Sequence, residues 1–211
     1  MRYYPVFLDL KDKRAVVVGG GKVAERKISG LLRAGAAVTV ISPSLTSGLQ
    51  KTLSRKKITY RGRPYRRGDL KGAFLVVAAT DSPETNRRVS KDAPGLVNVV
   101  DVPSECNFIA PSVVRRGPLL LAISTSGTSP AFARTLRREL EKEYGPEFTE
   151  YLGFVKKVRA KAMTAIPEKD RREAFLKGLA SEQILKSLRS RGLQTVKETV
   201  LGRMKRLTAS R

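Results

Sequence analysis

Histidine and tryptophan are absent from this 211-residue chain. The lack of histidine removes the most common general base and the most common metal ligand. Because Cys106 is the only cysteine, the sequence also excludes an internal disulfide and a closed zinc site of cysteine and histidine ligands. Any proton transfer must therefore fall to Asp, Glu, Tyr or Lys side chains, or to a substrate.

Long apolar runs and acidic residues are scarce as well. No run of 18 apolar residues occurs and the start lacks a signal-peptide pattern, so we expect a cytoplasmic protein that does not enter membranes. Only 19 acidic residues stand against 42 basic ones, which gives a net charge of +23. This balance suggests a nucleic acid, an anionic membrane or a strongly acidic small molecule as partner, or a compositional habit of the source organism. Charge alone does not choose among them.

The most informative stretch covers residues 14–43 and combines apolar runs with a glycine-rich turn. Residues 15–18 and 38–41 predict two short buried strands, because β-branched residues dominate both. Residues 23–34 predict a helix between them that stops at Gly35. We expect one face of this helix to carry Val23, Ala24, Lys27, Ile28, Leu31 and Leu32.

The turn GGGKVA fits the dinucleotide fingerprint G-x-G-x-x-G/A, with Gly19, Gly21 and Ala24 in the three key places. Gly19 permits a tight turn, Gly21 lets the backbone approach a pyrophosphate, and Ala24 lets helix and strand pack closely. A glycine triplet alone would indicate only a flexible turn. The strand, turn, helix and strand context favours nucleotide binding instead.

The ribose-binding position departs from the usual pattern. Many NAD sites place an Asp or Glu about 20 residues after the glycines, where it bonds the ribose 2′-hydroxyl. This chain has Ser42-Pro43-Ser44 there. A serine hydroxyl or the backbone can contact a ribose, and no carboxylate repels a 2′-phosphate. The motif therefore indicates a dinucleotide and leaves NAD and NADP open.

Two further apolar runs, residues 73–79 and 96–100, predict buried strands. Ligands of open α/β sheets bind beyond the carboxyl ends of the strands. Thr80 and Asp81 follow the first run and Asp101 follows the second, so these side chains are expected beside the cofactor. Capping of the next helix explains Asp81 equally well.

Other segments complete the pattern. A weak helix is expected at 45–56 and a short strand at 58–60; the basic loop 61–67 is either solvated or faces a substrate. Strands around Gly117-Pro118 predict a hairpin outside the main sheet. Ser129 is expected to cap a helix at 131–143. The hydroxyl-rich residues before it either serve only in capping this helix or also form an anion-binding site. From residue 151 onward, helical spacing predominates, with 16 basic and 5 acidic residues.

Several motifs, in their order, resemble those of the precorrin-2 dehydrogenases, which are stand-alone enzymes or the N-terminal half of siroheme synthase. They are GGGKVAERKISGLLRAGAAVTVISP, AATDSPETN, NVVD and FIAPSVVRRGPLLLAISTSGTSPAFARTLRRELE. The resemblance spans about residues 3–150. It implies an α/β fold with a Rossmann-like parallel sheet. The implied parts are an NAD-binding domain at 1–112, a dimerisation region at 113–150 that exchanges strands in a homodimer, and a small all-helical basic domain at 151–211.

The resemblance also implies an activity and its residues. NAD accepts a hydride as precorrin-2 is oxidised to sirohydrochlorin, and Asp101 is the catalytic residue, our candidate base for the accompanying proton. Because precorrin-2 is a polycarboxylate, guanidinium groups are candidate substrate ligands, namely Arg115, Arg116, Arg134 and Arg137. The predicted cofactor-binding residues are Gly19, Gly21, Lys22, Val23, Ser42, Pro43, Ser44 and Thr80.

Three alternatives or additions stay open. Some family members also insert iron and use the same aspartate; no metal-ligand cluster stands in this sequence, although Glu105 is placed to assist proton removal. A nucleic-acid-binding module built on the basic tail would bind with a steep salt dependence, but no known binding motif is present. In siroheme synthases a serine of the ISTSGTSP loop is phosphorylated, and Thr125 occupies that position here.

Overall fold

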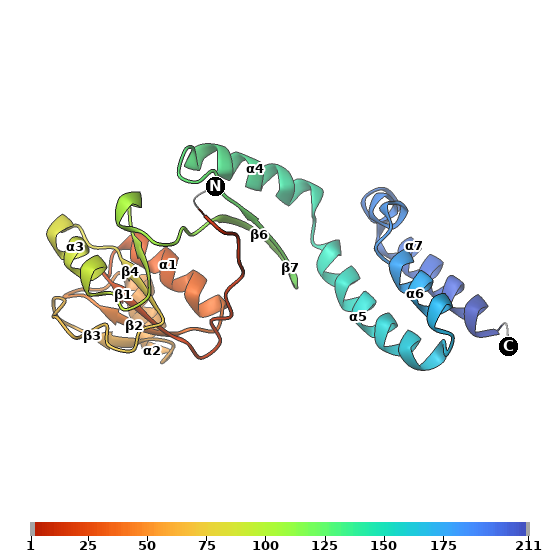
Figure 1. Ribbon diagram of the computed structural model, residues 1–211, viewed down its shortest axis with the longest axis horizontal. Helices are drawn as coiled ribbons and strands as arrows, with labels where there is room; N and C mark the ends of the chain where they lie inside the picture. Colours follow the sequence, from red (N-terminus) through yellow and green to blue (C-terminus); the bar gives the residue numbers. More distant parts are fainter. Residues whose placement is uncertain (1–2, 210–211) are drawn as a thin grey trace. The chain divides into compact units, whose positions relative to one another are not determined.

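The computed structural model describes residues 3–209. The chain divides into two compact units, Met1–Ala110 and Pro111–Arg211, which are described separately below. The predicted three-part division, with boundaries after residues 112 and 150, stays a prediction. The α/β class with a Rossmann-like parallel sheet and a helical C-terminal part is confirmed (Figure 1).

The first unit is built on one sheet of five parallel strands in the order β3-β2-β1-β4-β5 (Figure 1). Chain order reverses between β1 and β4, which run side by side in the centre. In sheets of this kind a dinucleotide binds across the crevice at such a reversal, outside the carboxyl ends of the strands. The strands are β1 Arg14–Val18, β2 Ala37–Ile41, β3 Thr59–Arg61, β4 Leu75–Ala78 and β5 Leu96–Val99.

Helices cover both faces of this sheet. Alternation along the strands sends Val17 and Val77 to one face, where they pack with Ile28 of α1, and Val16 and Val76 to the other. The second face packs against α3. The helices are α1 Lys22–Arg33, α2 Ser47–Ser54 and α3 Pro83–Asp92, followed by the short 3₁₀ helix η1 Pro103–Glu105.

The apolar face predicted for α1 is wrong at one position. Ala24 and Ile28 are buried in the core, but the side chain of Val23 is 37% exposed and lies outside it. The cause is geometric, since Val23 precedes Ala24 in the first turn and is rotated away from the sheet. Lys27 lies on the predicted face and is partly buried. The helix ends near Gly35, which adopts φ +82° as a helix terminator.

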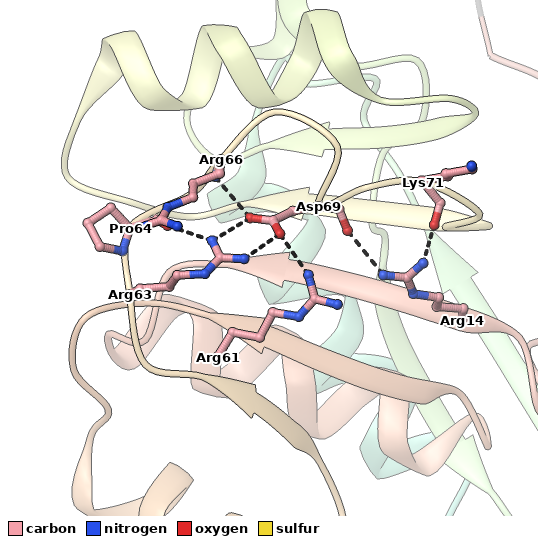
Figure 2. Close-up of polar contacts among 7 residues, drawn as sticks. All are labelled: Arg14, Arg61, Arg63, Pro64, Arg66, Asp69 and Lys71. Atoms are coloured by element: carbon pink, nitrogen blue, oxygen red, sulfur yellow. Dashed lines mark hydrogen bonds and ion pairs between the residues drawn. The ribbon is translucent and has the colours of Figure 1, made fainter.

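The basic loop after β3 is only partly solvated, since Arg61 and Arg63 are half-buried while Arg66 and Arg67 are exposed. The side chains of Arg61 and Arg63 both contact the buried carboxylate of Asp69 (Figure 2). Arg63 donates two hydrogen bonds, at 2.8 and 2.7 Å, one to each carboxylate oxygen, and Arg61 donates one at 2.7 Å. The backbone N–H of Arg66 donates a further bond at 2.9 Å. Arg14 of β1 donates to the backbone carbonyl of Asp69 at 3.0 Å, which ties the loop to the central strand.

These contacts predict an acid-sensitive contribution to stability. The Arg63 hydrogen bond is the main cause that lowers the pKa of Asp69 to about 2. Because an unfolded aspartate titrates at about 3.9, the carboxylate should stabilise the fold by about 2 kcal/mol above about pH 4, and this should vanish as the pH falls through about 2. Asp69→Asn should lower the free energy of unfolding by a similar amount at neutral pH, measured by urea denaturation. The exposed Glu84→Gln is the control, and equal stability of both variants would contradict the account.

The second unit begins with the predicted hairpin. Strands β6 Ser112–Arg116 and β7 Leu119–Ile123 pair in antiparallel register around Gly117, which adopts φ +57°. The helix α4 Pro130–Glu143 follows, and the Ser129 hydroxyl accepts a hydrogen bond from the backbone N–H of Phe132, so the predicted cap is confirmed.

Three helices with their own apolar core form the rest of this unit. They are α5 Glu147–Ala165, α6 Lys169–Gly178 and α7 Glu182–Ala209, and the last is broken at Gly192, where φ is +79°. Phe175, Leu188 and Val196 are almost completely buried at the centre of their contacts. Among residues 3–209, no helix has both the length and the apolar character needed to cross a membrane.

Candidate cofactor site and active site

The three glycines after β1 have three different structural roles. Gly19 adopts φ +123°, and a Cβ there would overlap the backbone carbonyl of Ala79 at the end of β4. Its N–H donates to the carbonyl of Ile41 at the end of β2 at 2.9 Å. Gly19 therefore packs between the ends of β2 and β4, the two strands that flank β1, which only a residue without a side chain permits.

Gly20 occupies a variable position of the fingerprint, yet it is equally constrained. A Cβ there would overlap the carbonyl of Ser44 and lie 2.8 Å from the hydroxyl of Ser42. Its own carbonyl accepts a hydrogen bond from the N–H of Thr46 at 3.0 Å. Gly20 thus allows the loop after β2 to pack against the glycine turn, a role that the motif alone does not reveal.

Gly21 differs from both, because a Cβ there would have no atom within 4 Å. It is the N-cap of α1, with φ −80° and ψ −176°, and no side chain caps the helix. The first N–H groups of α1 thus have no side-chain cap, and with the helix dipole they are the kind of groups that hold a pyrophosphate. Lys22 and Val23 follow with exposed side chains at the same helix end.

The loop after β2 supplies hydroxyl and backbone groups at the predicted ribose position. Ser42 is buried, with its N–H bonded to the carbonyl of Arg61 at 3.2 Å, while Pro43 and Ser44 are exposed. The hydroxyl of Ser42 lies beside Gly20. The structure thus brings the predicted residues of this loop next to the glycine turn.

Thr80, at the end of β4, is fixed by a residue that sequence reasoning missed. The buried Asn86 accepts hydrogen bonds from the Thr80 N–H at 3.2 Å and hydroxyl at 2.8 Å, and donates to its carbonyl at 3.0 Å. An asparagine six residues later in AATDSPETN was the available signal. The helix cap is Ser82, which accepts from the N–H of Thr85 at 3.1 Å, so Asp81 is exposed and not needed as the cap.

Asp101 lies just beyond β5 at the same edge of the sheet. The preceding Val100 donates its N–H to the carbonyl of Ala78 at 2.9 Å, which fixes this segment beside the end of β4. Asp101 is exposed and adopts φ +61°, a left-handed conformation that costs a non-glycine residue about 1 kcal/mol. A strained, exposed carboxylate at the cofactor edge is consistent with a catalytic role.

Glu105 and Cys106 differ in how fully their side chains are hydrogen-bonded. The Oε1 atom of Glu105 lies 3.7 Å from Nε of Arg87 on α3, whereas its Oε2 atom is buried and has no hydrogen-bond partner among the described residues. Cys106 is buried, and its sulfur accepts from the N–H of Val99 at 3.1 Å. The thiol therefore packs against β5 as part of the fold. Within residues 3–209, no group of three or more His, Cys, Asp or Glu side chains could hold a metal ion.

The four predicted substrate arginines belong to the second unit and differ in their partners. Arg116 donates to the carbonyls of Tyr144 at 2.6 Å and Glu141 at 3.0 Å, so it stabilises the C-terminal end of α4. Arg137 pairs with Glu141 at 2.5 Å. Arg115 on β6 and Arg134 on α4 are exposed. Arg116 and Arg137 thus both contact Glu141, and the substrate role of the four arginines stays a prediction.

Comparison with known proteins agrees with this geometry. Residues 6–112 match the family described as "Putative NAD(P)-binding". The chain belongs to this family. Residues 116–143 match a second family, described as "Sirohaem biosynthesis protein central". The match to an NAD(P)-binding family covers the whole sheet and the glycine turn described above.

Curated relatives are siroheme synthases. That of Methylobacillus flagellatus is 38% identical over 210 residues, which cover 96% of this chain and 45% of the relative. That of Nitrosospira multiformis is 47% identical over 148 residues, which cover 67% of this chain and 31% of the relative. The chain thus spans less than half the length of these two relatives.

A solved structure matches over nearly all of this chain. It is SirC, precorrin-2 dehydrogenase, with a TM-score of 0.81 and 28% sequence identity over 97% of this chain and 100% of that one. The resemblance stated from the sequence is therefore confirmed, and the comparisons support NAD as the cofactor.

Proposed function

We propose that this protein is an NAD-dependent dehydrogenase that oxidises precorrin-2 to sirohydrochlorin in siroheme biosynthesis. The observation that carries the proposal is the full-length likeness to SirC, precorrin-2 dehydrogenase, on a chain with an intact dinucleotide turn. The 38% identity to the siroheme synthase of Methylobacillus flagellatus supports the same proposal. We also propose a cytoplasmic location.

The residues at the carboxyl edge of the sheet have separate proposed roles in cofactor binding and proton removal. The uncapped N–H groups of α1 after Gly21 would hold the pyrophosphate, and Ser42-Pro43-Ser44 would contact the adenosine ribose. Thr80, held by Asn86, would line the opposite side of the crevice. NAD, when bound, supplies the hydride acceptor. Asp101 would take the proton that the substrate loses together with the hydride, so that the substrate gives up two hydrogens in total.

The strongly basic composition suits this substrate. A polycarboxylate is drawn to a chain with a net charge of +23, and long-range attraction raises its rate of encounter. The exposed Arg115 and Arg134 are the freest of the four predicted ligands, since Arg116 and Arg137 have partners within the chain. We therefore propose Arg115 and Arg134 as the first substitutions to examine for a rise in substrate KM.

A cofactor competition tests the proposed function. Precorrin-2 is generated enzymatically and mixed with the purified protein and NAD, NADP or no cofactor, and sirohydrochlorin is followed by its visible absorbance. Conversion that depends on NAD supports the proposal, and a preference for NADP would overturn the cofactor assignment alone. Absence of conversion with either cofactor, in a protein that binds NAD, would overturn the substrate assignment.

We propose that the protein acts as a homodimer through its second unit. Phe132 and Leu136, four residues apart on α4, are 56% and 36% exposed, and Val113 on β6 is 39% exposed. Residues at this spacing share one helix face, so the second unit presents apolar side chains that a second copy would cover. The match of residues 116–143 to a sirohaem biosynthesis central region agrees with a specialised role for this segment.

Analytical ultracentrifugation should find a dimer. Phe132→Asp should raise its dissociation constant by about 30-fold or more, as for a buried aromatic anchor in an interface. Thr135→Asp, exposed on the same helix, is the matched control for added charge. A wild-type monomer at micromolar concentration, or equal effects of both variants, would contradict the proposed interface.

A further inference from the structure

The carboxylate of Glu25 connects the start of α1 with the start of α2. Glu25 stands in the first turn of α1, where its N–H donates to the carbonyl of Gly21 at 2.9 Å. Its Oε2 atom accepts a hydrogen bond from the hydroxyl of Thr46, the N-cap of α2, at 2.5 Å. Both side chains are half-buried. A hydroxyl that donates to a carboxylate makes one of the stronger hydrogen bonds in proteins, and this one joins two helices.

Glu25 also supplies a charge that α2 lacks. The first turn of α2 contains no acidic residue, although the start of a helix carries a partial positive charge. A Cβ on Gly48 would overlap the Glu25 carboxylate, so this group lies directly against that turn. The Thr46 hydroxyl accepts the N–H of Leu49 at 3.3 Å while it donates to Glu25. The hydroxyl is therefore fixed by one bond on each side.

Thr46 in turn holds the end of the loop that follows β2. Its N–H donates to the carbonyl of Gly20 at 3.0 Å. Gly20 itself packs against the hydroxyl of Ser42 and the carbonyl of Ser44. One residue thus contacts the glycine turn through its backbone and α1 through its side chain. The loop proposed to contact the adenosine ribose is tied at its carboxyl end to the segment proposed to hold the pyrophosphate.

We propose that Glu25 is a positioning residue for the cofactor, which holds residues 42–46 through Thr46 in the place where they meet the adenosine ribose. This inference rests on the proposed role of that loop in cofactor binding. A loop that is already ordered loses less conformational freedom when the ligand binds, and this raises affinity. Glu25 acts through Thr46 and needs no contact with the cofactor.

The first test separates cofactor binding from turnover. Glu25→Met keeps the length of the side chain and removes both oxygens, so the Kd for NAD in calorimetry should rise about 10-fold, roughly the contribution of one charge-assisted hydrogen bond. The kcat for precorrin-2 oxidation at saturating NAD should stay within about twofold, because hydride transfer takes place at the nicotinamide end. Glu25→Gln keeps an acceptor oxygen and should recover most of the affinity.

Matched controls distinguish positioning from a loss of stability. Glu84→Met removes an exposed glutamate from the first turn of α3 and should bind NAD as the wild type does. Leu53→Ala removes a side chain of α2 that packs against the core, so it should lower the thermal midpoint and leave the Kd for NAD unchanged. A rise in Kd in Leu53→Ala equal to that in Glu25→Met would overturn the positioning role.

ADP-ribose locates the effect within the cofactor, because it contains the adenosine ribose and the pyrophosphate but no nicotinamide ring. Its Kd should rise in Glu25→Met by the same factor as that of NAD. An unchanged Kd for ADP-ribose would overturn the proposal, since the loss would then lie at the nicotinamide end.

A double-mutant cycle tests whether Glu25 works through Thr46. In a Thr46→Val background, Glu25→Met should cause no further loss of NAD affinity, because the hydroxyl that it holds is already gone. Thr46→Ser keeps the hydroxyl and should bind NAD nearly as well as the wild type. Losses that multiply in the double variant, or wild-type affinity in Glu25→Met, would overturn the proposal. These affinities are measured without precorrin-2, so they decide the role of Glu25 even if the protein binds NAD and fails to convert precorrin-2.

Discussion

Asp101→Asn is expected to lower the rate of precorrin-2 oxidation by about 10²- to 10⁴-fold, the usual contribution of a positioned general base. Asparagine keeps the shape of the side chain and tolerates the φ of +61° at this position, so the fold should be unchanged. The affinity for NAD should also persist, because Asp101 lies beyond β5 and not at the glycine turn. Steady-state kinetics and calorimetric NAD titration measure the two quantities separately.

Asp81→Asn is the matched control for Asp101→Asn. Asp81 is an exposed carboxylate that follows the neighbouring strand β4, and the helix cap is made by Ser82. It should therefore retain most of the activity. Full activity of Asp101→Asn would keep the reaction and remove Asp101 from it, and equal losses in both variants would indicate a general effect of charge at this edge.

Substitutions in the glycine turn give the second large expected effect. Gly21→Ala is expected to weaken NAD binding, and Gly19→Ala is expected to weaken folding. Gly21→Ala should leave the thermal midpoint nearly unchanged, because the added methyl group meets no atom within 4 Å and φ is −80°. That methyl group would lie where a pyrophosphate approaches α1, so NAD affinity should fall by about 10- to 100-fold. Differential scanning fluorimetry with and without NAD measures both.

Gly19→Ala should behave in the opposite way. Its methyl group would overlap the carbonyl of Ala79, and φ of +123° is outside the range that alanine adopts. The expected loss is about 3 kcal/mol or more in the free energy of unfolding. A Gly19→Ala variant as stable as the wild type, or a Gly21→Ala variant that binds NAD normally, would contradict the described turn.

The sequence alone was enough to predict the elements that are determined by residues close together in the chain. The strands β1 and β2 and the helix α1 followed from apolar runs around Gly19 and Gly21, within about 30 residues of chain. The hairpin around Gly117 and the cap at Ser129 are local in the same sense. Each is decided by residues that are neighbours both in the chain and in space.

The remaining features depend on contacts between distant residues. Lys27 donates a hydrogen bond to the side chain of Asn98, 71 positions away, and no periodicity in either segment joins them. The arginines of the loop after β3 suggested a solvated or substrate-facing patch, because their shared partner Asp69 is buried only once the chain has folded. Arg116 likewise meets the end of α4 through folding. Some of the positively charged side chains that suggested an acidic ligand therefore form contacts within the protein.

The most direct test of the account is the stoichiometry of the reaction. Precorrin-2 is converted by the purified protein with NAD, and NADH and sirohydrochlorin are quantified in the same sample over time. Equal molar amounts of the two products are expected at every time point, and both should form at least 100-fold more slowly in Asp101→Asn and about 10- to 100-fold more slowly in Gly21→Ala at low NAD. Sirohydrochlorin formation without NADH would contradict the central claim that this sheet edge transfers the hydride.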